Sequence, residues 1–110
     1  MKVKRLISLA ALAAAGSLPA AAPAPAHRDY TIAIAGMHFG PPPAGLEVGD
    51  TIIWVNRDIV AHSATARDHG FDVTVQPRQS VRVTLRRAGG IAFYCRFHPA
   101  MQGILSVAAR

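Results

Sequence analysis

Cysteine is nearly absent from this sequence, since Cys95 is the only one among 110 residues. A disulfide within the chain is therefore impossible. A c-type haem is excluded as well, because its Cys-x-x-Cys-His attachment motif does not occur. A lone cysteine in an exported chain needs an explanation of its own, since it can oxidise or pair with another chain. Binding a metal ion supplies such an explanation.

No hydrophobic run in the chain is long enough to cross a membrane as a helix. The longest run, Leu6–Leu18, is well short of the ~20 residues that the hydrocarbon core requires, and Pro19 interrupts it. Positive charges precede this run and the small residues Ala24–Ala26 follow it, an order typical of a secretory signal peptide. We therefore expect residues 1–26 to be removed on export to the periplasm, and residues 27–110 to form a single domain without a membrane span.

Acidic residues are few, with 6 Asp and Glu against 12 Lys and Arg, and the formal net charge is +6. Three of the basic residues, Lys2, Lys4 and Arg5, leave with the expected signal peptide, which lowers the charge of the mature domain to about +3. The remaining arginines are scattered and do not alternate with aromatic residues, so no nucleic-acid surface is indicated. The excess of basic over acidic residues instead favours acidic or anionic partners.

Long helical periods and repeats of fixed length are also lacking in residues 27–110. Short runs of β-branched, aromatic and alternating residues occur instead, separated by glycine and proline turns. We expect strands at residues 30–34, 51–55, 80–86, 91–95 and 103–107, with weaker ones near 63–66 and 71–75. The run at 51–55 is apolar enough to be buried on most of both faces. Short strands at this spacing favour an all-β sandwich or barrel.

One short segment combines three side chains that bind metals. Cys95, His98 and Met101 are separated from one another by two residues, so a tight loop can direct a thiol, an imidazole and a thioether at one point. His62 follows the strand of Trp54 and its turn, and is the best-placed fourth donor. Two imidazoles, a thiolate and a weak thioether are the ligand set of a blue-copper electron-transfer site.

These residues belong to a longer pattern that resembles the cupredoxins, the family of small blue (type 1) copper proteins. The pattern runs through Gly49–Asn56, Asp58, His62-Ser63 and Phe71-Asp72 and ends in Phe93–Ile104. The Cys-x2-His-x2-Met spacing is similar to that of the amicyanin branch, whereas the plastocyanin and pseudoazurin branches have longer loops. Two local differences are visible. Ser63 stands where several relatives have asparagine, and Pro77-Arg78 stands where relatives often have Pro-Gly.

The resemblance implies a cupredoxin-like, Greek-key β-sandwich of about eight strands that binds one copper ion, cycling between Cu(I) and Cu(II). It assigns the ligand roles to His62, Cys95, His98 and Met101. The implied function is that of a periplasmic one-electron carrier, a monomer and not an enzyme. The implied partners are redox proteins such as a c-type cytochrome or a periplasmic dehydrogenase. A periplasmic protein for copper delivery or resistance would use the same four residues and is the alternative.

Other site chemistries fit these residues less well. A thiol enzyme would need a lowered pKa at Cys95, and no helix N-terminus is expected beside it. Copper oxidases and reductases typically need His-x-His pairs, which do not occur. A zinc site would include a neutral thioether and no carboxylate. Among the other histidines, His38 is a weaker candidate for a place beside the site, and His69 is expected in a solvated turn.

Overall fold

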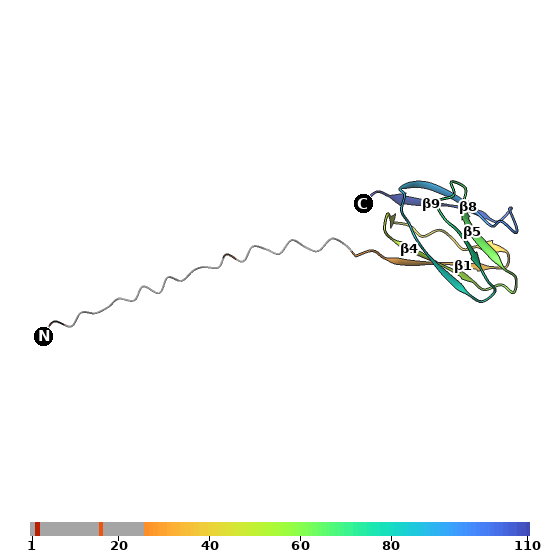
Figure 1. The fold of residues 1–110 in the computed structure, drawn as a ribbon, viewed down its shortest axis with the longest axis horizontal. Helices are drawn as coiled ribbons and strands as arrows, with labels where there is room; N and C mark the ends of the chain where they lie inside the picture. Colours follow the sequence, from red (N-terminus) through yellow and green to blue (C-terminus); the bar gives the residue numbers. More distant parts are fainter. Residues whose placement is uncertain (1, 3–15, 17–25) are drawn as a thin grey trace.

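The computed structural model describes residues 2, 16 and 26–110 (Figure 1). The predicted signal peptide, residues 1–26, therefore lies almost entirely outside the described residues. In the part of the chain that is described, no helix has the length and apolar character needed to cross a membrane.

Two β-sheets pack face to face, with β1 and β4 in one layer and β5, β8 and β9 in the other (Figure 1). The first sheet has the order β2–β1–β4–β7 and comprises β1 (Asp29–Ala35), β2 (His38–Phe39), β4 (Thr51–Asn56) and β7 (Ser80–Thr84). The second has the order β3–β9–β8–β5–β6 and comprises β3 (Leu46–Glu47), β5 (His62–Ala66), β6 (Asp72–Val75), β8 (Gly89–Tyr94) and β9 (Gln102–Ala108). The predicted all-β sandwich is confirmed, and the two-residue strands β2 and β3 raise the number of strands above the expected eight.

The core lies between the sheets because each strand turns every second side chain inward. In β4, Ile52, Trp54 and Asn56 are buried, whereas the residues between them are only half-buried. The expectation that this strand would be buried on most of both faces was therefore wrong, since no layer formed by residues 26–110 covers the outer face of its sheet. Aromatic rings surround the Trp54 indole, with centroid distances of 5.1 Å to Phe93 and 5.7 Å to Phe39.

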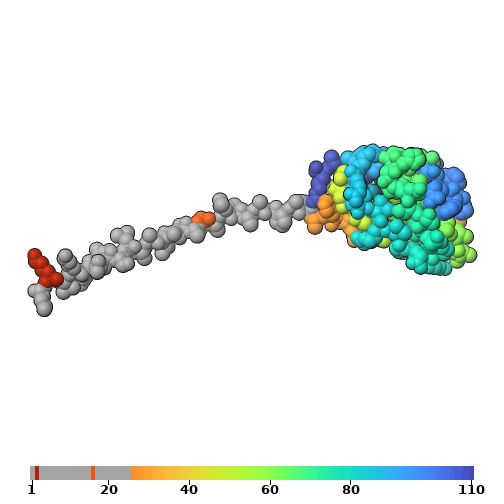
Figure 2. Space-filling model, in the orientation of Figure 1, coloured from red at the N-terminus to blue at the C-terminus, as the bar shows by residue number. Residues whose placement is uncertain are grey.

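The strand pairings bring three connections to one end of the sandwich, here called the loop end. β1 and β4 are parallel, so Ile34 and Asn56 lie side by side where the β1–β2 turn and the β4–β5 loop begin. β8 and β9 are antiparallel, and Tyr94 pairs with Gln102 at the base of the β8–β9 loop. This loop is the blue one at the right in Figure 1, and in Figure 2 its atoms lie above the yellow-green atoms of the β4–β5 loop.

The turn between β6 and β7 contains a strained residue. Arg78 has a φ of 66°, in the left-handed region that favours glycine, which agrees with the departure from Pro-Gly at this position. We expect Arg78→Gly to raise the free energy of unfolding by up to about 1 kcal/mol, because relief of strain exceeds the added entropy of the unfolded chain. Denaturant unfolding measures this, with Arg57→Gly as the control. Arg57 is exposed and has no positive φ, so its replacement should lower stability; the same sign for both variants would contradict the prediction.

Asp50 joins two segments at the end of the sandwich opposite the loop end. Its buried carboxylate accepts hydrogen bonds from the backbone N–H groups of Arg28 and Glu47, each at 2.9 Å. The bond from Arg28 is the main reason why the pKa of Asp50 lies below its ordinary value, although burial opposes the shift. A carboxyl with a lowered folded-state pKa stabilises the fold above its unfolded-state pKa. This contribution disappears as the pH falls through the folded-state pKa.

We therefore expect Asp50→Asn to cost about 1.5–3 kcal/mol of unfolding free energy at pH 7, because a charged acceptor is lost. The difference from the wild type should begin to shrink below about pH 4, where the carboxyl of the unfolded chain takes up its proton, and should disappear as the pH falls through the lower folded-state pKa. Denaturant unfolding at pH 7 and at acidic pH provides the measurement. A difference that stays constant with pH would contradict the role of the charge.

Candidate metal centre

The β8–β9 loop that carries three of the predicted ligands is closed by its own backbone. The N–H of Cys95 donates to the carbonyl of Met101 at 3.0 Å, and the N–H of His98 donates to the carbonyl of Cys95 at 3.3 Å. The N–H of Met101 donates in turn to the carbonyl of His98 at 2.8 Å. These three bonds connect only the three predicted ligands, because two intervening residues are the spacing that a tight turn closes with one backbone hydrogen bond. The loop therefore holds the three backbones close together.

The structure places His62, the fourth predicted ligand, against this loop. His62 begins β5, and its Nδ1 lies 3.7 Å from Sγ of Cys95. The imidazole of His98 stands beside that of His62, with 5.5 Å between ring centroids and an interplanar angle of 63°. His62 and Cys95 are fully buried, Met101 is 7% exposed and His98 is half-buried. Tertiary folding thus brings the imidazole from β5 to the thiol of the loop.

The donor set fits a soft metal ion. Imidazole nitrogens with thiol and thioether sulfurs suit copper, whereas magnesium and calcium need oxygen ligands. Among the described residues, no group of three or more His, Cys, Asp or Glu side chains is arranged to hold a metal ion. The four residues therefore fit copper by their chemistry, and their role as ligands stays a prediction.

Asp58 determines which nitrogen of His62 faces the thiol. Its Oδ2 lies 2.8 Å from Nε2 of His62, so the ring presents Nδ1 to Cys95. The same carboxylate accepts the backbone N–H groups of Gly36 and Met37 in the β1–β2 turn, at 2.7 and 3.0 Å. The Met37 bond, followed by the His62 contact, lowers the pKa of Asp58 despite partial burial. The sequence analysis named Asp58 but did not predict its contact with His62. The only local indication of this contact is that Asp58 lies four residues before His62.

The thiol of Cys95 also has a hydrogen-bond donor. The backbone N–H of Ser63 points at Sγ from 3.4 Å. Burial raises the pKa of the Cys95 thiol, but the hydrogen bond from Ser63, the contact with His62 and the backbone N–H groups of the loop together lower it by more, and the pKa lies below its usual value. A thiolate is the form of cysteine that binds metals, so these contacts favour metal binding.

Exposed apolar side chains gather around the candidate centre at the loop end. Phe97 precedes His98 and is 48% exposed, and Met37 in the β1–β2 turn is 38% exposed. Ile59 and Val60, in the loop before His62, are 81% and 41% exposed. The sequence reading did not single out this last pair, because two apolar residues in a turn have no periodicity.

The other histidines lie apart from the ligand contacts. His38 is exposed on β2. His69 is exposed in the turn between β5 and β6 with a φ of 65°, as expected for a solvated turn.

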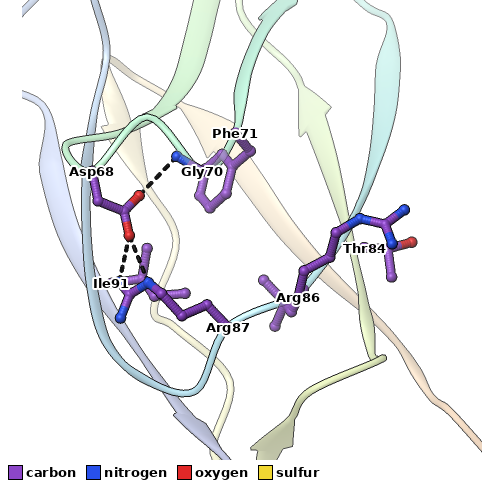
Figure 3. Close-up of a pocket in the computed structure, with 8 residues that line it drawn as sticks. Asp68, Gly70, Phe71, Thr84, Arg86, Arg87 and Ile91 are labelled. Atoms are coloured by element: carbon purple, nitrogen blue, oxygen red, sulfur yellow. Dashed lines mark hydrogen bonds and ion pairs between the residues drawn. The ribbon is translucent and has the colours of Figure 1, made fainter.

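A pocket of about 180 Å³ lies away from the candidate centre (Figure 3). It opens between the β5–β6 turn and the connection from β7 to β8, and Phe71 and Ile91 form part of its wall. The Asp68–Arg87 ion pair, with Nε 2.7 Å from Oδ2, stands at one side. None of the predicted ligands lines this pocket, so it is separate from the metal centre.

Comparison with known proteins agrees with the fold and the motif. The model of the cupredoxin-like domain family matches residues 6–107. The chain belongs to this family. It is 30% identical to amicyanin of Paracoccus denitrificans, over 86% of this chain and 85% of that protein. It is 31% identical to the methylamine utilization protein MauL of Methylorubrum extorquens, over 94% and 90% of the two chains. A Cu(I) form of an amicyanin variant superposes with a TM-score of 0.64 at 28% identity, over 76% of this chain and 85% of that one.

Proposed function

We propose that this protein is a periplasmic copper protein that carries one electron at a time, and that His62, Cys95, His98 and Met101 hold a single copper ion. The observation that carries the proposal is the buried contact between Nδ1 of His62 and Sγ of Cys95, at the base of the short ligand loop. Membership of the cupredoxin-like family and the similarity to amicyanin support it. Copper would supply a couple between Cu(I) and Cu(II), which an electron carrier needs and which no side chain here provides.

Contacts within the chain hold the His62 ring and the backbone of the ligand loop. Asp58 holds the His62 ring through Nε2, and the backbone bonds of the loop hold Cys95, His98 and Met101. Donors fixed in advance change position little when the oxidation state changes, which favours rapid electron transfer. A carrier of this kind transforms no substrate, so the protein is not an enzyme.

Electrons would pass at the loop end, where the half-buried His98 lies next to exposed apolar side chains. Phe97, Met37 and Val60 would form the contact surface for the redox partner. The partner would be a c-type cytochrome or a periplasmic dehydrogenase, and its acidic residues would face exposed arginines of this chain. The carrier itself would act as a monomer.

The copper-loaded protein provides the test. An electron carrier is expected to show the intense visible absorption of a thiolate–Cu(II) site, to lose it on reduction and to recover it on reoxidation through many cycles. Incubation of the reduced form with a Cu(I) chelator measures how firmly copper is held. Absence of the thiolate band would contradict the proposal, and ready transfer of Cu(I) to an acceptor protein would favour copper delivery instead.

A further inference from the structure

Arg96, the residue after Cys95, is held at both its backbone and its side chain. Its backbone N–H donates to Oγ of Ser63 at 2.8 Å. Its guanidinium donates through Nε to Oδ1 of Asp72 and through Nη2 to Oγ1 of Thr74, each at 2.9 Å. Since β5 lies between β8 and β6 in the sheet, the Arg96 side chain crosses β5 to reach these two residues of β6.

Two buried hydroxyls connect the backbone bond of Arg96 to its ion pair. Oγ of Ser63 lies 2.9 Å from Oγ1 of Thr65, and Oγ1 of Thr65 donates to Oδ1 of Asp72 at 2.9 Å. Thr65 has a single hydroxyl proton, which it gives to Asp72, so Ser63 must be the donor to Thr65. The bonds thus close a ring in which Arg96 donates at both of its ends and Oδ1 of Asp72 accepts from both sides. We call the four residues Ser63, Thr65, Asp72 and Arg96 the Arg96 cycle.

The Arg96 cycle meets the candidate metal centre at Ser63. The backbone N–H of Ser63 donates to Sγ of Cys95 while its hydroxyl accepts from the next residue of the loop. Ser63 and Thr65 are 0% and 3% exposed, so their hydroxyls depend on these partners. Buried chains of hydrogen bonds strengthen one another, and the negative charge of Asp72 polarises this chain from its far end. Ser63, which stands where several relatives have asparagine, is therefore part of a hydrogen-bonded group with Thr65, Asp72 and Arg96.

We propose that the Arg96 cycle fixes the position of Cys95 for copper, and that Asp72 and Arg96 are positioning residues of the metal centre. The inference rests on the proposed function. Asp72 lies on β6, and its carboxylate holds the loop from a distance, because it accepts hydrogen bonds from both Thr65 and Arg96. Substitutions of residues around a metal site that orient its ligands typically weaken metal binding about 10- to 100-fold.

The test compares Asp72→Asn, Arg96→Gln and Thr65→Val with the wild type in the copper-loaded protein. Release of Cu(I) to a chelator should become about tenfold faster in all three variants, because each removes or weakens a hydrogen bond of the cycle. A purely Coulombic effect would instead speed release in Asp72→Asn and slow it in Arg96→Gln. The reduction potential should rise in Asp72→Asn, which loses a negative charge, and fall in Arg96→Gln, which loses a positive one.

Asp29→Asn is the matched control, because Asp29 forms an ion pair with Arg82 at 2.7 Å that is also exposed but lies on β1 and β7. Its copper release should match that of the wild type within about twofold, since exposed pairs contribute little. Thr65→Ser should restore the slow release of the wild type, because it returns the hydroxyl without the methyl group. The metal-free protein gives a second readout, the amide exchange rate of Arg96, which should rise in Asp72→Asn and Thr65→Val and stay unchanged in Asp29→Asn.

The outcomes separate the two proposals. A wild-type protein that takes up no copper overturns the proposed function, and the role of the cycle with it. A wild type that binds copper, together with variants that release it no faster than Asp29→Asn, overturns the role of the Arg96 cycle alone. Opposite changes of the release rate in Asp72→Asn and Arg96→Gln would also overturn it, because they would show an effect of charge rather than of position.

Discussion

Cys95→Ser is expected to abolish the visible absorption of the copper-loaded protein and to weaken copper binding by orders of magnitude. A thiolate is a soft donor with a strong, covalent bond to copper, and a serine hydroxyl is neither soft nor deprotonated near neutral pH. The surroundings of Sγ of Cys95 favour the thiolate form. The N–H of Ser63 points at it, and Nδ1 of His62 lies 3.7 Å away. The measurement is the visible spectrum of the variant after addition of Cu(II), with a metal content assay.

Met101→Leu is the matched variant for this prediction. It removes the thioether from the other end of the same loop and keeps a buried apolar side chain of similar volume. The thioether is the weak ligand of such a site, so the intense absorption should persist and the reduction potential should change. If Cys95→Ser kept the absorption, the assignment of the thiolate would be contradicted. If Met101→Leu lost it, the thioether would have a larger role than predicted.

Trp54→Ala is expected to lower the free energy of unfolding by about 3–5 kcal/mol, the largest effect on stability that we predict. The indole is fully buried in the centre of the core, in contact distance of the Phe39 and Phe93 rings. Removing it leaves a large cavity that neighbouring strands cannot fill. Since small domains are stable by only about 5–15 kcal/mol, much of the variant should be unfolded under mild denaturing conditions.

Trp54→Phe distinguishes the contribution of aromatic packing to stability from the effect of the indole N–H. In the described part of the chain, Nε1 of Trp54 is a buried nitrogen without a hydrogen-bond partner. Phenylalanine removes that unsatisfied N–H, which offsets part of the lost packing, so the cost should stay below about 1.5 kcal/mol. Denaturant unfolding of the metal-free variants, followed by circular dichroism, measures both changes. Equal losses for the alanine and phenylalanine variants would contradict the importance of ring packing.

The fold class could be predicted from the sequence because strand formation here has a local signal. In β7, Val81 and Val83 alternate with exposed Arg82, and the expected strand at 80–86 agrees with Ser80–Thr84. The short strands β2 and β3 had no such signal, because two residues cannot show alternation. Their pairing depends on the neighbouring strands β1 and β9.

Burial on the outer faces could not be predicted in the same way. An apolar run such as 51–55 has the same sequence whether one or both of its faces are covered. Only the arrangement of the layers shows that Ile53 and Val55 face outward and stay half-buried. The opposite occurs in β5, where even Ser63 and Thr65 are buried because Arg96 crosses over the strand.

The sequence by itself determined which three residues of the β8–β9 loop can bind a metal ion together. Cys95, His98 and Met101 are near one another along the chain, so their spacing and their backbone turns suffice to bring them together. The tertiary structure alone decided how His62 meets them, that Asp58 turns Nδ1 toward the thiol, and that Asp72 is linked to Arg96. These contacts join loops to strands in different parts of the sandwich. They depend on which strands pair and in which register, and that is settled by the packing of the whole sandwich rather than by any local sequence.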